Sequence, residues 1–372
     1  MTCHTNFWKL WQKQGFFTII SCLARFVPDT LISMTTWYPD FLGKDYTNTT
    51  IDLQPDEQGP VKATLVRHLP ETAQTADSAP KFAFLGVHGW NDYFYQTELA
   101  QAVTSCGGRF YALDLRRYGR SHEEGQMWGY ISDLKKYDEE ILAAMEIIKA
   151  EHQEDFPIIL YGHSTGGLTT SLFASRHASK LAGLALNSPW LEYQDSPITH
   201  HVGKPFVDTV ARFSPEKILS ESDNGFYQRV LTGWKEEDGP MPVHQAGDPF
   251  FEGGWKPDER FRHFPSFPIR AGWLSAVLNG HAQVAKGLNM DLPVLVMTSA
   301  RSDITETWNQ GQRSVDGVLD VELIWKRAAY LSNHTTIVKL SGAIHDVVFS
   351  RAEVRTEAFA HLRNWITHVA RI

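Results

Sequence analysis

The sequence predicts an α/β protein built on a mostly parallel, doubly wound sheet. Short apolar segments of strand length alternate with longer segments whose apolar residues recur at helical spacing. Continuous apolar runs are typical of strands that are buried on both faces. We expect such strands at residues 81–87, 110–113, 158–161, 181–186, 293–297 and 335–340. The alternation predicts that helices cover both faces of the sheet.

Other segments complete this architecture. Residues 49–53 and 61–68 alternate apolar and polar positions, which predicts an antiparallel pair at one edge of the sheet. Helical spacing of apolar residues predicts helices at about 95–106, 131–152 and 354–370.

The alternation of strands and helices stops after Pro189 and returns near residue 289. The intervening segment is rich in aromatic residues, prolines and glycines, and it is too long for a loop. We therefore expect an inserted cap over the sheet edge. The predicted domains are an N-terminal extension (1–33), a core in two parts (34–188 and 289–372) and the cap (189–288).

Composition narrows the class of protein. The chain has 372 residues, of which 42% are hydrophobic and 21% are charged, as in soluble globular proteins. A formal net charge of −8 and the lack of a basic run argue against nucleic acid as a partner. Three widely spaced cysteines, Cys3, Cys22 and Cys106, form neither a disulfide framework nor a Cys-x-x-Cys metal motif. These features favour a reducing, cytoplasmic location.

The N-terminal extension allows three interpretations. Lys9 and Lys13 precede a short apolar run at 15–24, which has some features of an export signal but is too short to span a bilayer. The same residues could form an amphipathic helix that covers an apolar patch or lies on a membrane surface as a peripheral lipid contact. Alternatively, translation starts at Met34.

The strongest chemical motif lies at residues 162–166, Gly-His-Ser-Thr-Gly. It follows a strand-like run and precedes a helix-permissive segment, which is the arrangement of a nucleophile elbow. Gly162 and Gly166 fit because a Cβ at either position would collide with the neighbouring strand or helix. Ser164 is then a candidate nucleophile. A plain glycine-rich turn is the alternative interpretation of the pentapeptide.

A serine nucleophile needs a general base and an acid that orients the base. In this type of fold the order along the chain is serine, acid, histidine, each on a loop after a strand. Among the 16 histidines, only His345 lies in the loop directly after the last predicted strand. His345 is therefore the candidate base.

Together these segments resemble the α/β-hydrolase superfamily, and in particular its serine aminopeptidase-like branch with monoacylglycerol lipases and lysophospholipases. The matching motifs are His88-Gly89, Asp114-x-Arg116-x-x-Gly119-x-Ser121, Gly162-x-Ser164-x-Gly166 and Gly342-x-x-His345. They cover roughly residues 49–372. Arg117-Tyr118 stands where many relatives have a glycine. We interpret the motif that begins at Asp114 as a structural turn that Arg116 stabilises.

Two aspartates remain candidates for the acid. Asp303 follows the seventh predicted strand closely, whereas Asp316 resembles the family's acid before two apolar residues and a helix start. The separation of Asp316 from His345 fits one helix and one strand. We favour Asp316, which requires that residues 301–315 loop out and back. Asp320 is better explained as the N-cap of the next helix.

The oxyanion hole should consist of two backbone N–H groups. Thr165 directly follows the nucleophile, and the resemblance implies Trp90 as the second donor. The histidines of the predicted cap lack metal-ligand spacing, so we expect neither a metal ion nor another cofactor.

These features predict a serine hydrolase that cleaves a carboxylic ester through an acyl-enzyme. The aromatic cap suggests a small-molecule substrate with an apolar part, and the resemblance implies monoacylglycerols, lysophospholipids or medium-chain esters. An aminopeptidase or amidase is one alternative, with Glu192, Asp195 and Asp208 as candidates to hold a substrate amine. A non-catalytic binding protein of the same fold is another. The sequence does not determine an oligomeric state.

Overall fold

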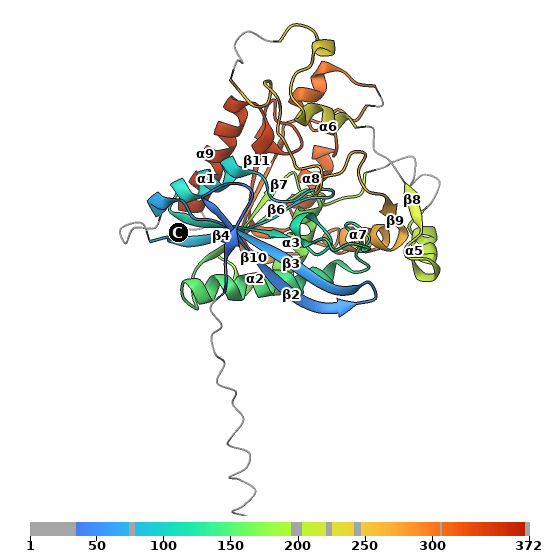
Figure 1. The fold of residues 1–372 in the computed structure, drawn as a ribbon. Coiled ribbons are helices and arrows are strands. Elements are labelled where there is room, and N and C mark those ends of the chain that lie inside the picture. Colours follow the sequence, from blue (N-terminus) through green and yellow to red (C-terminus); the bar gives the residue numbers. More distant parts are fainter. Residues whose placement is uncertain are drawn as a thin grey trace, which may run out of the picture. The chain divides into compact units, whose positions relative to one another are not determined.

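A single large sheet organises the chain in the computed structural model (Figure 1). The structure describes residues 35–73, 79–194, 203–220, 225–241, 247–305 and 307–368. Within these residues nine strands pair in the order β1-β2-β3-β5-β4-β6-β7-β10-β11. The N-terminal extension (1–33), with its three interpretations, lies outside the described residues.

The six strands from β5 to β11 in this order are parallel to one another. β1, β2 and β3 are antiparallel and form one edge, as the alternating patterns at 49–53 and 61–68 predicted. The strand bounds are β1 Tyr38–Pro39, β2 Tyr46–Asp56, β3 Gly59–His68, β4 Phe82–Val87, β5 Gly108–Asp114, β6 Ile158–His163, β7 Gly183–Asn187, β10 Met290–Ser299 and β11 Ser332–Leu340. The doubly wound, mostly parallel sheet is thus confirmed.

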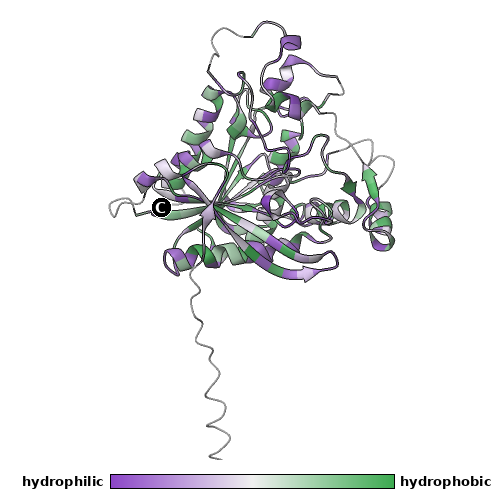
Figure 2. Cartoon of the chain, in the orientation of Figure 1, coloured by the Kyte–Doolittle hydropathy of each residue, from purple (hydrophilic) through white to green (hydrophobic). Residues whose placement is uncertain are grey.

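Helices cover both faces of this sheet. On one face lie α1 (Thr97–Ser105) and α9 (Ala352–His368), whose buried residues share a core with β4, β5 and β6. On the other face lie α2 (Asp138–Glu151), α3 (Thr165–His177) and α8 (Val321–Ala328). Figure 2 shows hydrophobic residues along the central strands and hydrophilic residues on the outward parts of the helices.

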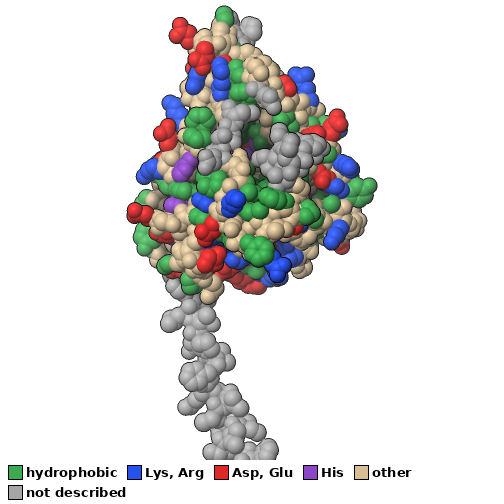
Figure 3. Space-filling view, turned by 90° about the vertical axis from the view of Figure 1, so that its right-hand side faces the viewer, with side chains coloured by type: hydrophobic (Ala, Val, Ile, Leu, Met, Phe, Trp, Pro, Cys, Tyr) green, Lys and Arg blue, Asp and Glu red, His purple; other side chains and the backbone are tan. Residues whose placement is uncertain are grey.

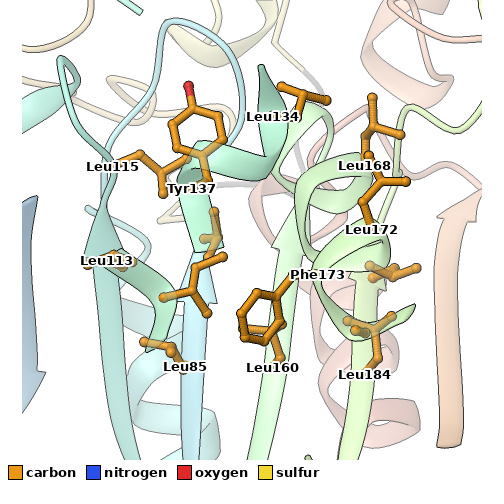
Figure 4. Close-up of a cluster of buried hydrophobic side chains, with 14 of the residues drawn as sticks. Leu85, Leu113, Leu115, Leu134, Tyr137, Leu160, Leu168, Leu172, Phe173 and Leu184 are labelled. Atoms are coloured by element: carbon orange, nitrogen blue, oxygen red, sulfur yellow. The ribbon is translucent and has the colours of Figure 1, made fainter. Parts of the chain in front are cut away.

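Successive strand residues alternate between the two cores because side chains of a strand point to opposite faces. Along β6, Ile158 and Leu160 belong to the core under α3, and Ile159 and Tyr161 belong to the core under α1. Figure 4 shows the first core, in which Leu160 and its neighbours on β4, β5 and β7 meet Phe173 of α3. Burial on both sides explains why these strands read as continuous apolar runs.

The helix predicted at 131–152 is shorter than expected. Asp133 caps a separate 3₁₀ turn at Leu134–Tyr137, and its side chain accepts a hydrogen bond from Lys135 N–H. The α-helix begins only at Asp138, where three acidic residues form the first turn. Leu134 and Tyr137 are buried at helical spacing, so the apolar pattern continues across a break in the helix.

The segment predicted as a cap contains α5 (Lys204–Phe213), β8 (Ile218–Ser220), α6 (Phe226–Leu231), β9 (Ile269–Arg270) and α7 (Ala271–Val284). In Figure 1, α6 lies apart from the group formed by α5, β8, β9 and α7. Helix α7 packs against α3, the helix that follows Ser164. Figure 3 shows basic and acidic side chains interspersed with hydrophobic ones on one face of the molecule. No helix in the described part of the chain is long and apolar enough to cross a membrane.

Candidate active site

Ser164 lies between β6 and α3 in a backbone conformation that non-glycine residues rarely adopt. Its φ angle is 53°, in the left-handed region. A Cβ at Gly166 would collide with the backbone oxygen of His88, and one at Gly162 would meet Gly166 O at 2.5 Å. Strand β6, helix α3 and the loop after β4 therefore approach so closely that only glycine fits at these two positions. The tight turn presents Ser164 at the carboxyl edge of the sheet.

The loop after β4 lies directly against Ser164. A Cβ on Gly89 would be 3.1 Å from Ser164 Cβ and 3.2 Å from His163 Nδ1. The neighbouring Trp90 N–H has no backbone acceptor among the described residues. Thr165 is the first residue of α3, so its N–H is one of those that have no partner within the helix. Both N–H groups predicted for an oxyanion hole thus belong to segments that border Ser164.

His88 holds the start of this loop. Its Nδ1 lies 2.8 Å from Gly89 O, and its Nε2 accepts a hydrogen bond from Leu115 N–H at 3.1 Å. Because Nε2 is an acceptor, the proton is on Nδ1 and the ring is neutral. His88 therefore fixes the backbone between β4 and the residues after β5.

His345 and Asp316 form a buried pair. His345 Nδ1 donates to Asp316 Oδ2 at 2.9 Å, and Asp316 is completely enclosed. The other oxygen, Oδ1, accepts from the backbone N–H groups of Val318 at 2.9 Å and Leu319 at 2.8 Å. Since Nδ1 carries the proton that is donated, Nε2 is free to accept one.

Asp303 makes a different contact. Its backbone N–H donates to Asp316 O at 3.0 Å, and Asp316 N–H donates to Arg301 O at 3.0 Å. The chain therefore leaves the end of β10 and returns to it at Asp316, as the spacing argument required. The aspartate that His345 contacts is Asp316. Asp320 is the N-cap of α8, where its side chain accepts from Glu322 N–H, which confirms that expectation.

Ser164 and His345 lie in neighbouring loops without a hydrogen bond between their side chains. The ring of His163 is 5.0 Å from the ring of His345, measured between centroids. The Ser164 hydroxyl has no hydrogen-bond partner among the residues that the structure describes. Catalytic hydrogen bonds are often long in enzymes without substrate, so this geometry is compatible with a nucleophile and its base.

His163 is a buried imidazole without polar partners. Neither ring nitrogen has a hydrogen-bond partner in the described part of the chain, and Asp92 Oδ2 is 3.9 Å from Nδ1. Burial, and secondarily the neighbouring His345, holds the pKa of His163 well below its usual value. His163 is consequently neutral near pH 7.

Several residues at the site escaped prediction from the sequence. The buried Arg262 of the cap segment donates to Asp92 Oδ1 at 2.9 Å. Next to this pair, the Asn91 side chain forms two hydrogen bonds with the backbone of His263, at 2.7 and 3.0 Å. These contacts attach the cap segment to the loop that carries Trp90. Arg262 and His263 lie in a stretch without periodic pattern, so no sequence signal marks them.

Aromatic side chains surround these groups. The edge of the Tyr227 ring meets the ring of His345 with centroids 5.4 Å apart. The Trp90 ring packs against Trp273 at 4.0 Å and against Phe267 at 4.6 Å. A cavity of about 10 Å³ borders Thr165, His88 and Trp273, which is about the room that one water molecule needs. The described residues hold no group of three or more His, Cys, Asp or Glu side chains suited to a metal ion.

Comparisons with known proteins agree with this architecture. Residues 78–233 match the family model of serine aminopeptidase, S33. That range includes the loop after β4 and the elbow but ends before Asp316 and His345. No curated protein matches the chain.

Solved structures with a similar fold include three from different organisms. A monoacylglycerol lipase of Paleococcus ferrophilus is 19% identical, with a TM-score of 0.54, over 77% of this chain and 95% of that one. A soluble variant of monoglyceride lipase of Saccharomyces cerevisiae, in complex with a substrate analog, is 17% identical, with a TM-score of 0.57, over 88% and 97%. A carboxyl esterase of Bacillus coagulans, in complex with glycerol, is 15% identical, with a TM-score of 0.56, over 87% and 99%. At these identities the likeness concerns the fold.

Proposed function

Because the chain belongs to the α/β-hydrolase superfamily, we propose that it is a serine hydrolase that cleaves a carboxylic ester. The observation that carries this proposal is the buried hydrogen bond between Asp316 and His345, in the loops next to the strained Ser164. Chain order and geometry agree with the arrangement that acyl-transfer enzymes of this fold use.

In the proposed mechanism Ser164 Oγ attacks the ester carbonyl while its proton passes to His345 Nε2. Asp316 accepts from His345 Nδ1–H and stabilises the imidazolium that forms. The N–H groups of Thr165 and Trp90 stabilise the oxyanion, each contributing about 3 kcal/mol. His345 then protonates the leaving alcohol. Water attacks the acyl-enzyme by the same steps, which restores Ser164 and releases the acid.

Asp316 is the proposed acid in preference to Asp303. One oxygen of its side chain accepts a hydrogen bond from His345. The other accepts hydrogen bonds from two backbone N–H groups. Those three donors hold the carboxylate in place beside the imidazolium that forms. The alternative acid, Asp303, makes its contact with Asp316 through its backbone.

The substrate that we propose is a small ester with an apolar part. Aromatic rings of Trp90, Trp273 and Phe267 pack together beside the loop that borders Ser164. Trp273 also lines the small cavity beside Thr165. Monoacylglycerol-like and lysophospholipid-like esters remain proposals within this class, and rates for esters of graded acyl length would rank them.

The proposed aminopeptidase alternative lacks support from the acidic residues suggested for it. Glu192 is paired with Arg327. Asp208 accepts from Lys204 at 2.5 Å and from Ser275 at 2.7 Å. Asp195 lies outside the described residues. A substrate amine would have to compete with these partners for Glu192 and Asp208, so we prefer an ester.

Hydrolysis of p-nitrophenyl butyrate by the purified chain tests the proposal against a non-catalytic binding protein. We expect turnover that Ser164→Ala abolishes, because the variant lacks the hydroxyl that forms the acyl-enzyme. Ser188→Ala is a matched control, since Ser188 is a buried serine near the site with a φ of 41°. Absence of turnover in the folded wild-type chain, or equal turnover in Ser164→Ala, would overturn the proposal.

A further inference from the structure

Asn187 connects the loop of the candidate nucleophile to the loop of the candidate base. It is the last residue of β7, which lies between β6 and β10, and it is fully buried. Its backbone oxygen accepts the N–H of Ser164 at 3.1 Å. Its side chain reaches the residues that follow His345. The same residue therefore contacts both loops.

All the hydrogen-bonding groups of the Asn187 amide have partners. Nδ2 donates to Asp346 Oδ1 at 2.6 Å and to Tyr161 Oη at 2.7 Å. Oδ1 accepts from Val347 N–H at 3.1 Å. These partners determine which way the amide points, because a flipped amide would place its NH₂ against the N–H of Val347. Tyr161 lies on β6, and Asp346 and Val347 lie directly after His345.

Asp346 is a buried carboxylate that depends on this contact. Besides Asn187, its Oδ1 accepts only the N–H of Val348, at 3.2 Å, among the described residues. No lysine or arginine of the described chain forms an ion pair with it. Burial raises the pKa of Asp346, which the hydrogen bond from Asn187 and the nearby His345 oppose. The titratable and charged groups that face Asp346 are His345, Arg262, Asp92, Tyr95, Tyr161 and Tyr227.

We propose that Asn187 is a positioning residue that fixes the distance between Ser164 and His345, and that it acts on His345 through Asp346. Asp316 orients the His345 ring through Nδ1, and its other side-chain hydrogen bonds are to Val318 and Leu319 of its own loop after β10. Asn187 forms hydrogen bonds with both the elbow and the loop of His345. This inference rests on the proposed function, because it concerns the distance over which the proton moves from Ser164.

Three variants alter the Asn187–Asp346 hydrogen bond differently. Asn187→Leu removes it. Asn187→Asp places a second carboxylate against Asp346, so the contact persists only while the two share a proton, and it is lost at alkaline pH. The double variant Asn187→Asp with Asp346→Asn exchanges donor and acceptor and restores the hydrogen bond at every pH. Tyr161→Phe is the matched control, since it removes the other partner of Nδ2 and leaves the His345 loop untouched.

The measurements are kcat and KM for p-nitrophenyl butyrate from pH 6 to 10, with the thermal midpoint of each variant. We expect Asn187→Leu to lower kcat about 100-fold with KM nearly unchanged, as for a displacement of about 1 Å between reacting groups. Asn187→Asp should lose activity selectively at alkaline pH, and the double variant should regain at least tenfold there. Tyr161→Phe should lower the midpoint but retain kcat within about twofold.

Two results would overturn the inference while leaving the proposed function intact. One is a double variant that stays as slow as Asn187→Asp at alkaline pH. The other is a Tyr161→Phe variant that loses as much kcat as Asn187→Leu, since that would make the effect general to the core. If Asn187→Leu does not fold, the pH profiles of Asn187→Asp and the double variant decide. A wild-type chain without turnover would instead reject the proposed function, and this inference with it.

Discussion

Two regions at the same edge of the sheet differ in whether their buried polar side chains have partners. The end of β5 and the loop after it form three ion pairs: Asp114 pairs with Arg120, Arg116 with Glu140 and Arg117 with Asp56. His163, the last residue of β6, is buried with no hydrogen-bond partner for either ring nitrogen in the described chain. The Ser164 hydroxyl forms no hydrogen bond among the described residues. Paired charges hold a loop in place. Groups without partners remain available for chemistry or stay neutral.

The largest expected effect separates the two aspartates near β10. Asp316→Asn should lower kcat by about 10⁴-fold, because the imidazole would lose its orientation and the imidazolium its counter-charge. Asp303→Asn should change kcat little, because the contact of Asp303 with Asp316 uses its backbone. Steady-state rates for both variants, with circular dichroism to verify folding, provide the test. A larger loss in Asp303→Asn would exchange the two roles.

Loss of a paired charge after β5 should act on stability. Glu140 is fully buried and accepts from Arg116 through both oxygens, at 3.0 Å on Oε1 and 2.5 Å on Oε2. Glu140→Gln should therefore cost about 3–5 kcal/mol in the free energy of unfolding. Glu139→Gln is the control, since Glu139 contacts the same arginine from a partly exposed position and should cost about 1 kcal/mol or less. Urea denaturation measures both, and equal losses would contradict the contrast.

The packing of the elbow should show a smaller effect. Gly166→Ala forces a Cβ against backbone oxygens of the loop after β4, so we expect a loss of about 3 kcal/mol. At Gly86, in β4, a Cβ would be 3.7 Å from its nearest neighbours. Gly86→Ala should then be tolerated. Thermal midpoints decide, and a stable Gly166→Ala variant would mean that the elbow is looser than described.

The smallest expected effect concerns a second buried imidazole. Burial lowers the pKa of His281 to about 4, while the hydrogen bond to Trp190 O opposes the shift. Below the unfolded pKa of about 6.5 the unfolded chain binds a proton that the folded chain does not, so stability falls as pH decreases. His281 should thus remove about 2 kcal/mol between pH 7 and pH 5.

His281→Gln keeps a donor for Trp190 O but does not titrate, and it should flatten this pH dependence. Urea denaturation of both proteins at pH 7 and pH 5 gives the comparison. An unchanged difference between the two pH values in the variant would show that His281 does not contribute.

Local signals made the core and the elbow predictable. Apolar runs buried on both faces identified the parallel strands, and Gly162 and Gly166 identified the turn around Ser164 because their neighbours leave no room for a side chain. The acid remained open between Asp303 and Asp316, since spacing along the chain does not show which carboxylate faces His345. The acidic run at 138–140 was an available but unused signal for the true start of α2.

Long-range polar contacts could not be predicted. Arg262 meets Asp92 across 170 residues and Asn187 meets Asp346 across 159 residues. Neither contact produces a periodic pattern in the sequence, because each joins two segments that only the folded sheet brings together. Asn187 and Asp346 do occupy positions next to predicted strand ends and to His345, but only their three-dimensional arrangement relates them.

The central claim is that Ser164 is a nucleophile activated by His345. Its most direct test is treatment of the folded chain with a fluorophosphonate, followed by intact mass measurement and peptide mapping. The account predicts one adduct per chain, on Ser164, and none in Ser164→Ala. A folded wild-type chain that acquires no adduct, or acquires it on another residue, would contradict the account.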